Sequence, residues 1–484
     1  MKDKLANSFN SNPQQWLFSS AFATIALVLL GFYTEQYMLC LLPVLAIGII
    51  ITIINFGTVY YLILASLPIC VPIFIGSFST DLPTEPLMAI LMLCYFIFLF
   101  TNKKNGQKKY LQHPFIQIIV LQFMWYVIVV IFSTVPFISF KYLLAKSWYI
   151  TTFLLVTPLV LKETQHFKTA FWLLFYPLFF VTLYTIYNHW QHGFQFDNSN
   201  MMSLPFYKNH VDYACGLSIF FPLLFVASSW YKKGDLKKIL LHLAQIIFVF
   251  AIFVSYTRTA WLAIGLCLPV YFVIKWKMIK PALIVASAGL VLFVSFLTFE
   301  NRYMQYAPDY KKTIMHHNLS DHLQSTETLN DVSSAERLYR WVAAWEMGKA
   351  KPLTGFGPGG FVANYKHYAV SLFTTYVSGN VEHSTAHNYL LFLFAEQGII
   401  GLLLFILICM MVLIKGENIY HQTQNKTEKI IVMGLLISFV VVLFDNMLSD
   451  LIEAIKIGPF FYFIIALLVV QDLKNKKALH IHES

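Results

Sequence analysis

Residues 387–414 read HNYLLFLFAEQGIIGLLLFILICMMVLI, and this stretch decides the fold class. Glu396 is its only residue among Asp, Glu, Lys and Arg. A helix of about 20 apolar residues crosses the hydrocarbon core of a bilayer, which is about 30 Å thick. The stretch therefore predicts a transmembrane helix that begins near His387.

The rest of the chain has the same character. Of its 484 residues, 58% are hydrophobic, only 12% are charged, and 45 are Phe. An ordinary globular domain is about a quarter charged, so this composition excludes a soluble multidomain protein, a disordered chain and a coiled coil. The chain is predicted to be a polytopic membrane protein.

Fourteen apolar runs are candidate membrane spans. They lie at 16–32, 37–56, 58–78, 86–101, 114–133, 141–161, 168–188, 213–231, 238–255, 258–275, 280–299, 387–414, 428–447 and 455–472. Helices are expected, because open sheet edges would leave backbone groups unpaired in lipid and barrel strands would alternate in polarity. We therefore predict an all-α integral membrane protein with about 12–14 transmembrane helices.

The lysines predict the orientation of these spans. When successive loops are placed on alternate sides, most lysines fall on one side and the short loops of the other side hold only Lys141, Lys208 and Lys456, which identifies the first side as cytoplasmic. Both termini are then cytoplasmic, and the net charge of +10 reflects topology and requires no nucleic-acid partner. The expected division is an N-terminal bundle of about 11 helices over 1–299, a large outer loop over 300–386, and about three C-terminal helices with a cytoplasmic tail over 387–484.

All four arginines fall on the opposite, outer side: Arg258, Arg302, Arg337 and Arg340. Guanidinium is permanently charged, and its planar fork matches phosphate oxygens. Their placement predicts an external anion as ligand. The alternatives are a snorkelling Arg258 at the membrane interface and solvated charges at Arg337 and Arg340.

The outer loop contains two ordered-looking segments. Ser334 is predicted to cap an amphipathic helix whose one face carries Arg337, Trp341 and Trp345, lying on the membrane surface. The glycine-rich segment that contains Gly357 allows tight turns, either as a structural turn or as a nest for phosphate. No Gly-Lys-Ser/Thr follows it, so it is not a nucleotide P-loop.

Several other polar residues are candidates for the site. His387 and Asn388 stand at a helix start, and Glu396 lies deeper, as a functional group or as a bond to a neighbouring helix. His210 and Asp212 form a polar cluster near the same surface. Metal binding by the nearby His383 and His387 is not expected, because Ser384 stands where the zinc protease pattern needs Glu.

In this order, the motifs resemble the O-antigen ligase and polymerase superfamily. The matching pieces, which lie within residues 250–415, are Ser255-Tyr256-Thr257-Arg258-Thr259-Ala260-Trp261, Arg337-Leu338-Tyr339-Arg340-Trp341, Pro352-Leu353-Thr354-Gly355-Phe356-Gly357, His387-Asn388 and Gly398-Ile399-Ile400-Gly401. The resemblance implies a GT-C-like glycosyltransferase of the bacterial inner membrane. It would take a glycan from undecaprenyl diphosphate at the periplasmic face, in contact with membrane lipids and without a cofactor or metal.

The resemblance also implies residue roles. Arg258 and Arg337 would hold the donor diphosphate, with Arg340 as the alternative to Arg337, and His387 would deprotonate or orient the acceptor hydroxyl. Attack opposite the diphosphate would invert the anomeric centre. The leading expectation is a ligase acting on a lipid A–core sugar. A polymerase, a protein O-oligosaccharyltransferase and a transporter of lipid-linked sugar without catalysis are the alternatives.

Overall fold

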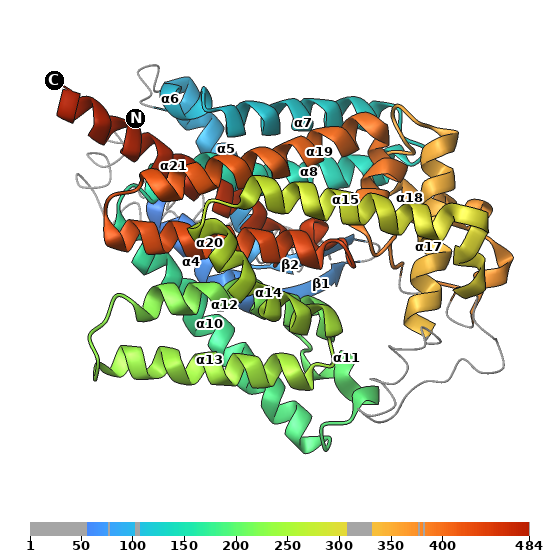
Figure 1. The fold of residues 1–484 in the computed structure, drawn as a ribbon, viewed down its shortest axis with the longest axis horizontal. Coiled ribbons are helices and arrows are strands. Elements are labelled where there is room, and N and C mark those ends of the chain that lie inside the picture. The colour runs from blue at the N-terminus through green and yellow to red at the C-terminus, as the bar shows by residue number, and fades with distance from the viewer. Residues whose placement is uncertain are drawn as a thin grey trace, which may run out of the picture.

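The computed structural model describes residues 56–75, 78–101, 107–306, 332–375, 378–380 and 383–483, and it is a bundle of long helices (Figure 1). The long helices are α5 (Thr84–Thr101), α7 (Pro114–Ile131), α8 (Pro136–Ile150), α10 (Thr164–Gln191), α12 (His210–Ser228), α13 (Leu236–Val254), α14 (Arg258–Lys275), α15 (Ile279–Thr298), α17 (Val332–Ala350), α19 (Tyr389–Gln422), α20 (Lys426–Asp445) and α21 (Gly458–Glu483).

Shorter elements connect them. They are the α-helices α4 (Phe56–Ser66), α6 (Lys108–Leu111), α9 (Thr157–Val160), α11 (Ser199–Met202) and α18 (Gly360–Asn364), the π-helix η3 (Thr151–Val156), the 3₁₀ helices η2 (Leu67–Ile69), η4 (Phe196–Asn198), η5 (Phe299–Tyr306), η6 (Tyr365–Tyr368), η7 (Ser371–Phe373) and η8 (Leu451–Glu453), and the strands β1 (Val71–Ile75) and β2 (Phe78–Leu82).

Within the described part of the chain, nine helices are long and apolar enough to cross a membrane. This confirms the prediction of an all-α, multi-pass membrane protein. The predicted runs 16–32 and 37–56 lie outside the described residues, except for Phe56. Each of the twelve other runs contains a helix, and α8, η3 and α9 together form one span, Pro136–Val160.

One predicted span, 58–78, is wrong in its second half. The helix ends at Ser66, and the chain continues through η2 into an antiparallel hairpin in which Val71 pairs with Leu82. Pro68 and Pro72 explain the change, because proline has no backbone N–H and disfavours helical backbone in the residue before it. The apolar composition hid this break.

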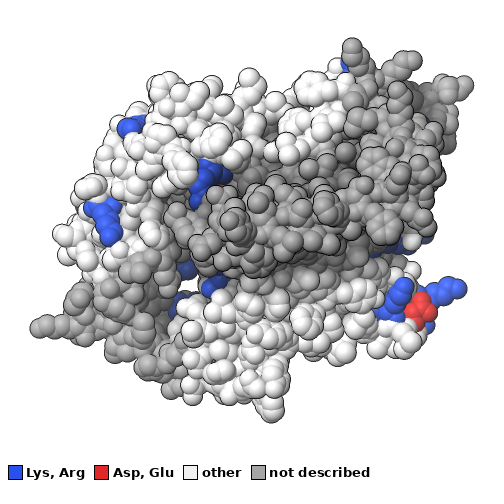
Figure 2. Space-filling model, turned by 180° about the vertical axis from the view of Figure 1, so that it is seen from behind, with Lys and Arg blue, Asp and Glu red and all other residues white. Residues whose placement is uncertain are grey.

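Many large apolar side chains are exposed, as lipid-facing helices require. In α15, residues 284–296 are exposed without interruption. Figure 2, which shows the molecule from behind, has charged side chains only at scattered points of its described surface. Apolar side chains exposed on this scale would be a liability in water, and they indicate that the helices face lipid.

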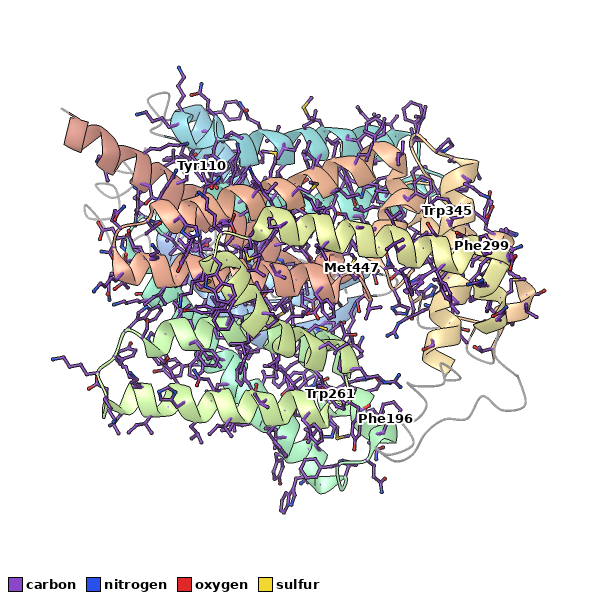
Figure 3. The ribbon with its side chains drawn as sticks, in the orientation of Figure 1. Tyr110, Phe196, Trp261, Phe299, Trp345 and Met447 are labelled. Atoms are coloured by element: carbon purple, nitrogen blue, oxygen red, sulfur yellow. The ribbon has the colours of Figure 1, made fainter. Side chains whose placement is uncertain are left out.

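The bundle has two ends of different character (Figure 1). We call the first the lysine end: it contains the connections 229–235, 276–278 and 423–425 together with the C-terminus. We call the second the loop end: it contains the connections 192–209, 255–257, 299–388 and 446–457. The arginine and His387 motifs all belong to the loop end. Figure 3 shows Phe196, Trp261, Phe299 and Trp345 towards this end, where aromatic rings suit a membrane interface.

Candidate functional site at the loop end

Helix α17 lies at the loop end and packs against α19 (Figure 1). Its buried face carries Glu336, Tyr339 and Arg340, whereas Arg337 is only partly buried and Trp345 is 52% exposed. The prediction that Ser334 caps this helix is wrong, because α17 already includes Val332. The two arginines are three residues apart and therefore lie on neighbouring sides of the helix, where Arg340 is buried and Arg337 is only partly buried.

Arg340 is held by partners from three segments. Its side chain is buried, with 4% of the residue exposed. Nη2 donates to Glu336 Oε2 at 3.3 Å and to Asn380 Oδ1 at 3.4 Å, and Nη1 donates to the Thr385 carbonyl at 3.2 Å. A buried guanidinium requires such compensation, and Glu336, four residues earlier on the same helix, supplies the opposite charge.

Glu336 is itself fixed by the loop that precedes α19. Its Oε1 accepts hydrogen bonds from the hydroxyls of Thr375 and Ser378. Asn380, the second partner of Arg340, accepts a bond from Ser384 N at 2.7 Å. The sequence analysis did not single out Glu336 or Asn380. The i, i+4 spacing of Glu336 and Arg340 was the signal that could have identified the first.

His387 contacts Arg340 directly. The ring Nε2 lies 3.4 Å from Arg340 Nη1. Because guanidinium only donates, Nε2 must accept, which places the proton of the neutral ring on Nδ1. Burial of the ring, followed by the charges of Arg340 and Arg337, lowers the pKa of His387 to about 3. The imidazole is therefore neutral at pH 7, and two cationic groups lie within electrostatic reach of it.

Asn388 caps the helix that follows. Its Oδ1 accepts from Leu391 N at 3.0 Å, and its Nδ2 donates to the Met447 carbonyl at 2.9 Å. The predicted helix start at His387 is thus displaced by two residues, to Tyr389. His387 itself has a backbone φ of 51°, in the left-handed region that non-glycine residues seldom occupy.

The glycine-rich segment packs into a break in α19. Gly357 N donates to the Glu396 carbonyl at 2.9 Å, and Ile399 N, beyond the break at Gly398, donates to the Pro352 carbonyl at 2.8 Å. The Glu396 carboxylate accepts from Phe361 N at 2.9 Å. For both Gly357 and Glu396, the sequence left a structural and a functional interpretation open. The contacts in the structure are of the structural kind.

Arg258 belongs to a second group of residues at the loop end. It is the first residue of α14, and the hydroxyl of the preceding Thr257 donates to the His210 carbonyl at 3.3 Å. His210 Nδ1 lies 2.5 Å from Asn200 Oδ1. Asp212 N donates to Asn209 Oδ1 at 2.8 Å, which caps α12. The structure thus connects the residue before Arg258 to His210, and a shared role of Arg258 and His210 stays a prediction.

Asp450 links the two groups electrostatically. Its carboxylate accepts from the Thr385 hydroxyl, two residues before His387. The pKa of Asp450 is raised to about 6, mainly by burial, and the negative charges of Glu453 and Asp212 contribute in the same direction. The Thr385 hydrogen bond and the charge of Arg340 act against this rise. Asp450 therefore lies within electrostatic reach of both Arg340 and Asp212. Among the described residues, no group of three or more His, Cys, Asp or Glu side chains is arranged to hold a metal ion.

The site residues coincide with a match to a known family. Residues 243–406, about a third of the chain, match the model of the O-antigen ligase family. The matched segment includes Arg258, Arg337, Arg340 and His387. No curated protein matches the chain. This multi-pass membrane protein is thus similar to the O-antigen ligase family through residues 243–406.

Proposed function

We propose that the protein transfers a glycan from undecaprenyl diphosphate to a hydroxyl of a lipid A–core sugar. The reaction would take place at the loop end, facing the periplasm of a bacterial inner membrane, with both termini in the cytoplasm. One observation carries the proposal: a neutral His387 contacts the buried Arg340 and lies within electrostatic reach of the partly buried Arg337, in the segment that matches the family. This arrangement combines a proton acceptor with cations suited to a diphosphate.

The two arginines of α17 would divide the work. Arg340 is bonded to Glu336, Asn380 and Thr385, so we assign it the positioning of His387. Arg337 is only partly buried, and we assign it to the donor diphosphate together with Arg258. Guanidinium groups at the leaving group would stabilise the negative charge that develops on it in the transition state.

The charges around His387 would couple donor binding to proton transfer. Without the donor, burial and the two arginines keep its pKa at about 3, which makes it a weak base. A bound diphosphate would offset these positive charges and raise the pKa towards the range that favours general base catalysis. The acceptor oxygen would then bond to the anomeric carbon, and the bond from that carbon to the diphosphate would break with its electron pair leaving on the diphosphate. His387 would take the hydroxyl proton on Nε2, its unprotonated nitrogen, in exchange for the 3.4 Å contact of that nitrogen with Arg340 Nη1.

Transfer by purified protein tests the proposal. Protein in lipid nanodiscs, given lipid-linked glycan and lipid A–core, should form the ligated product, and His387→Ala should abolish it. His383→Ala is the matched control, because His383 is exposed and lies four residues before His387 in the sequence. Near-normal turnover by His387→Ala would refute the assignment of the base, and no transfer by wild type to any acceptor would favour a transporter.

A deletion strain separates the related reactions, which use the same donor chemistry. Loss of a ligase leaves long lipid-linked polymer in the membrane. Loss of a polymerase leaves single repeats, and loss of a protein O-oligosaccharyltransferase removes glycoprotein. Accumulation of long polymer is the expected result, and either of the other outcomes would replace the ligase assignment.

A further inference from the structure

The connection between α20 and α21 grips the turn that carries His387. Tyr389 N donates to the Asn446 carbonyl at 2.9 Å, and Asn388 Nδ2 donates to the Met447 carbonyl at 2.9 Å. These two bonds fix the backbone on the helix side of His387. They join segments that are almost sixty residues apart in sequence, and residues 446 and 447 lie outside the part of the chain that matches the family.

Two carboxylates in the same connection add side-chain contacts. Asp450 accepts from the Thr385 hydroxyl on the other side of His387, and Glu453 Oε1 accepts from the Tyr389 hydroxyl at 2.8 Å. Asp450 and Glu453 stand at the two ends of η8, with Asp450 as its N-cap residue. The turn 385–389 is thus held before and after His387 by one short helical element.

This element is anchored to the bundle. Glu453 Oε1 also accepts from Lys146 Nζ of α8 at 2.6 Å, and both side chains are largely buried. Lys456 Nζ, a few residues later, donates to the carbonyls of Pro68, Cys70 and Phe206. Ionic and charge-assisted hydrogen bonds in a low-dielectric interior are strong when their partners are paired. The connection is therefore a fixed support for the turn.

The turn needs support because its backbone is unfavourable. His387 has a φ of 51° and His383 a φ of 54°. Residues in this region persist only where the surroundings over-determine them, and such positions cluster at functional sites. Thr385 also contacts Arg340, because the Thr385 carbonyl accepts a hydrogen bond from Arg340 Nη1. One residue thus connects Asp450 to the guanidinium that contacts His387.

We propose that Asp450 and Glu453 are positioning residues for glycan transfer, which act by holding the turn 385–389 so that His387 meets the acceptor hydroxyl. This inference rests on the proposed function. Asp450 acts through Thr385, and Glu453 acts through Tyr389 with Lys146 as its counter-ion. A misplacement of about 1 Å in a reacting group lowers turnover by about 10²-fold, so loss of either contact should act on kcat.

The Asp450 contact is tested by a double-mutant cycle. Thr385→Val and Asp450→Asn should each lower kcat by about 10-fold or more, with the donor KM within about twofold of wild type, and the double variant should be no worse than the more impaired single variant. Thr385→Ser restores the hydroxyl and should recover turnover. Wild-type kcat in Thr385→Val, or multiplicative losses in the double variant, would overturn the inference and indicate a direct role for Asp450.

The Glu453 contact has a conservative test and a matched control. Tyr389→Phe removes only the hydroxyl bonded to Glu453 and should lower kcat by several-fold without changing the yield of folded protein. Glu428 is an equivalent control, because it is also paired with a lysine, Lys474 at 3.0 Å, but at the lysine end. Glu428→Gln should leave kcat unchanged. Wild-type kcat in Tyr389→Phe would overturn the role of Glu453.

Failure of the inference differs from failure of the proposed function. If wild-type protein transfers glycan and the Thr385 and Tyr389 variants match it, the positioning role is refuted and the transferase assignment stands. If wild-type protein transfers nothing, the proposed function itself fails.

Discussion

The two ends of the bundle use charge in different ways. At the lysine end, the lysine of each ion pair stays partly exposed, with 34% of the Lys474 side chain exposed in its pair with Glu428 and 58% of the Lys476 side chain exposed in its pair with Asp472. At the loop end, Arg340 and Glu336 are buried and bonded to several polar partners. The first pattern suits orientation in a membrane, which requires only the presence of positive charge. The second fixes side chains in place, as chemistry requires.

The largest expected difference between the two ends is the loss of stability and activity when one ion pair is broken at each end. Arg340→Ala leaves Glu336 buried without its cation, which costs about 3–5 kcal/mol, and it should also abolish transfer. Lys474→Ala breaks a partly exposed pair and should cost about 0–1 kcal/mol. Thermal unfolding in detergent, together with the transfer assay, measures both. Equal losses of stability in the two variants would contradict the comparison.

Arg337→Lys separates charge from geometry at the loop end. Lysine keeps the positive charge but loses the planar fork, so kcat should fall by about 10² if Arg337 binds the diphosphate. Stability should fall by no more than about 1 kcal/mol, because the side chain is only partly buried and lysine keeps its charge. Arg302→Lys, at another arginine of the loop end, is the control and should retain activity. Full activity of Arg337→Lys would remove it from the donor site.

A glycine at each end tests how tightly the ends are packed. A Cβ at Gly398 would lie 2.0 Å from the Leu353 carbonyl oxygen, whereas a Cβ at Gly234 of the lysine end meets nothing within 4 Å. Both glycines have positive φ, 68° and 97°. Gly234→Ala should cost about 1 kcal/mol through backbone strain alone, and Gly398→Ala should cost clearly more. A similar melting temperature in both variants would contradict the close packing at the loop end.

The pH dependence of stability isolates His387. Its folded pKa of about 3 lies below the ordinary 6.5, so between these values the unfolded state binds a proton that the folded state does not. The stabilising effect of a neutral His387 is therefore lost as pH falls from about 6.5 towards 3. Relative to wild type, His387→Gln should gain about 2 kcal/mol on going from pH 8 to pH 5. The raised pKa of Asp450 has the opposite effect, because its protonation stabilises the folded state as the pH falls. Asp450 is present in both proteins, so its contribution cancels when their stabilities are compared. If the difference in unfolding free energy between His387→Gln and wild type is the same at pH 8 and pH 5, the lowered pKa of His387 is contradicted.

The sequence predicted most of the spans because each depends on local composition. Residues 258–275, for example, coincide with α14. The hairpin at 71–82 was missed because apolar character outweighed the signals of Pro68 and Pro72. Periodicity placed Arg337 and Arg340 about one helical turn apart, but it could not tell which of them would be buried, since that depends on α19 and the loop.

Long-range contacts were beyond the reach of the sequence. Asp450 and Glu453 were not among the predicted site residues, because no sequence pattern connects them to Thr385 or Tyr389. Such pairings follow from the packing of α19, α20 and α21, which brings distant segments to one end of the bundle. Lys146 illustrates the same limit, because its partner Glu453 is 307 positions away.

The break in α19 at Gly398 makes part of the loop inseparable from the bundle. The backbone groups of Ala395, Glu396 and Ile399 pair with residues 352–357. Withdrawing that segment would strand these polar groups among apolar helices, at a cost of several kcal/mol. Any substrate-driven rearrangement at this end is thereby restricted to the backbone outside 352–357. A peptide tag or fusion partner inserted into 352–357 would disrupt a membrane helix, although the segment belongs to a loop.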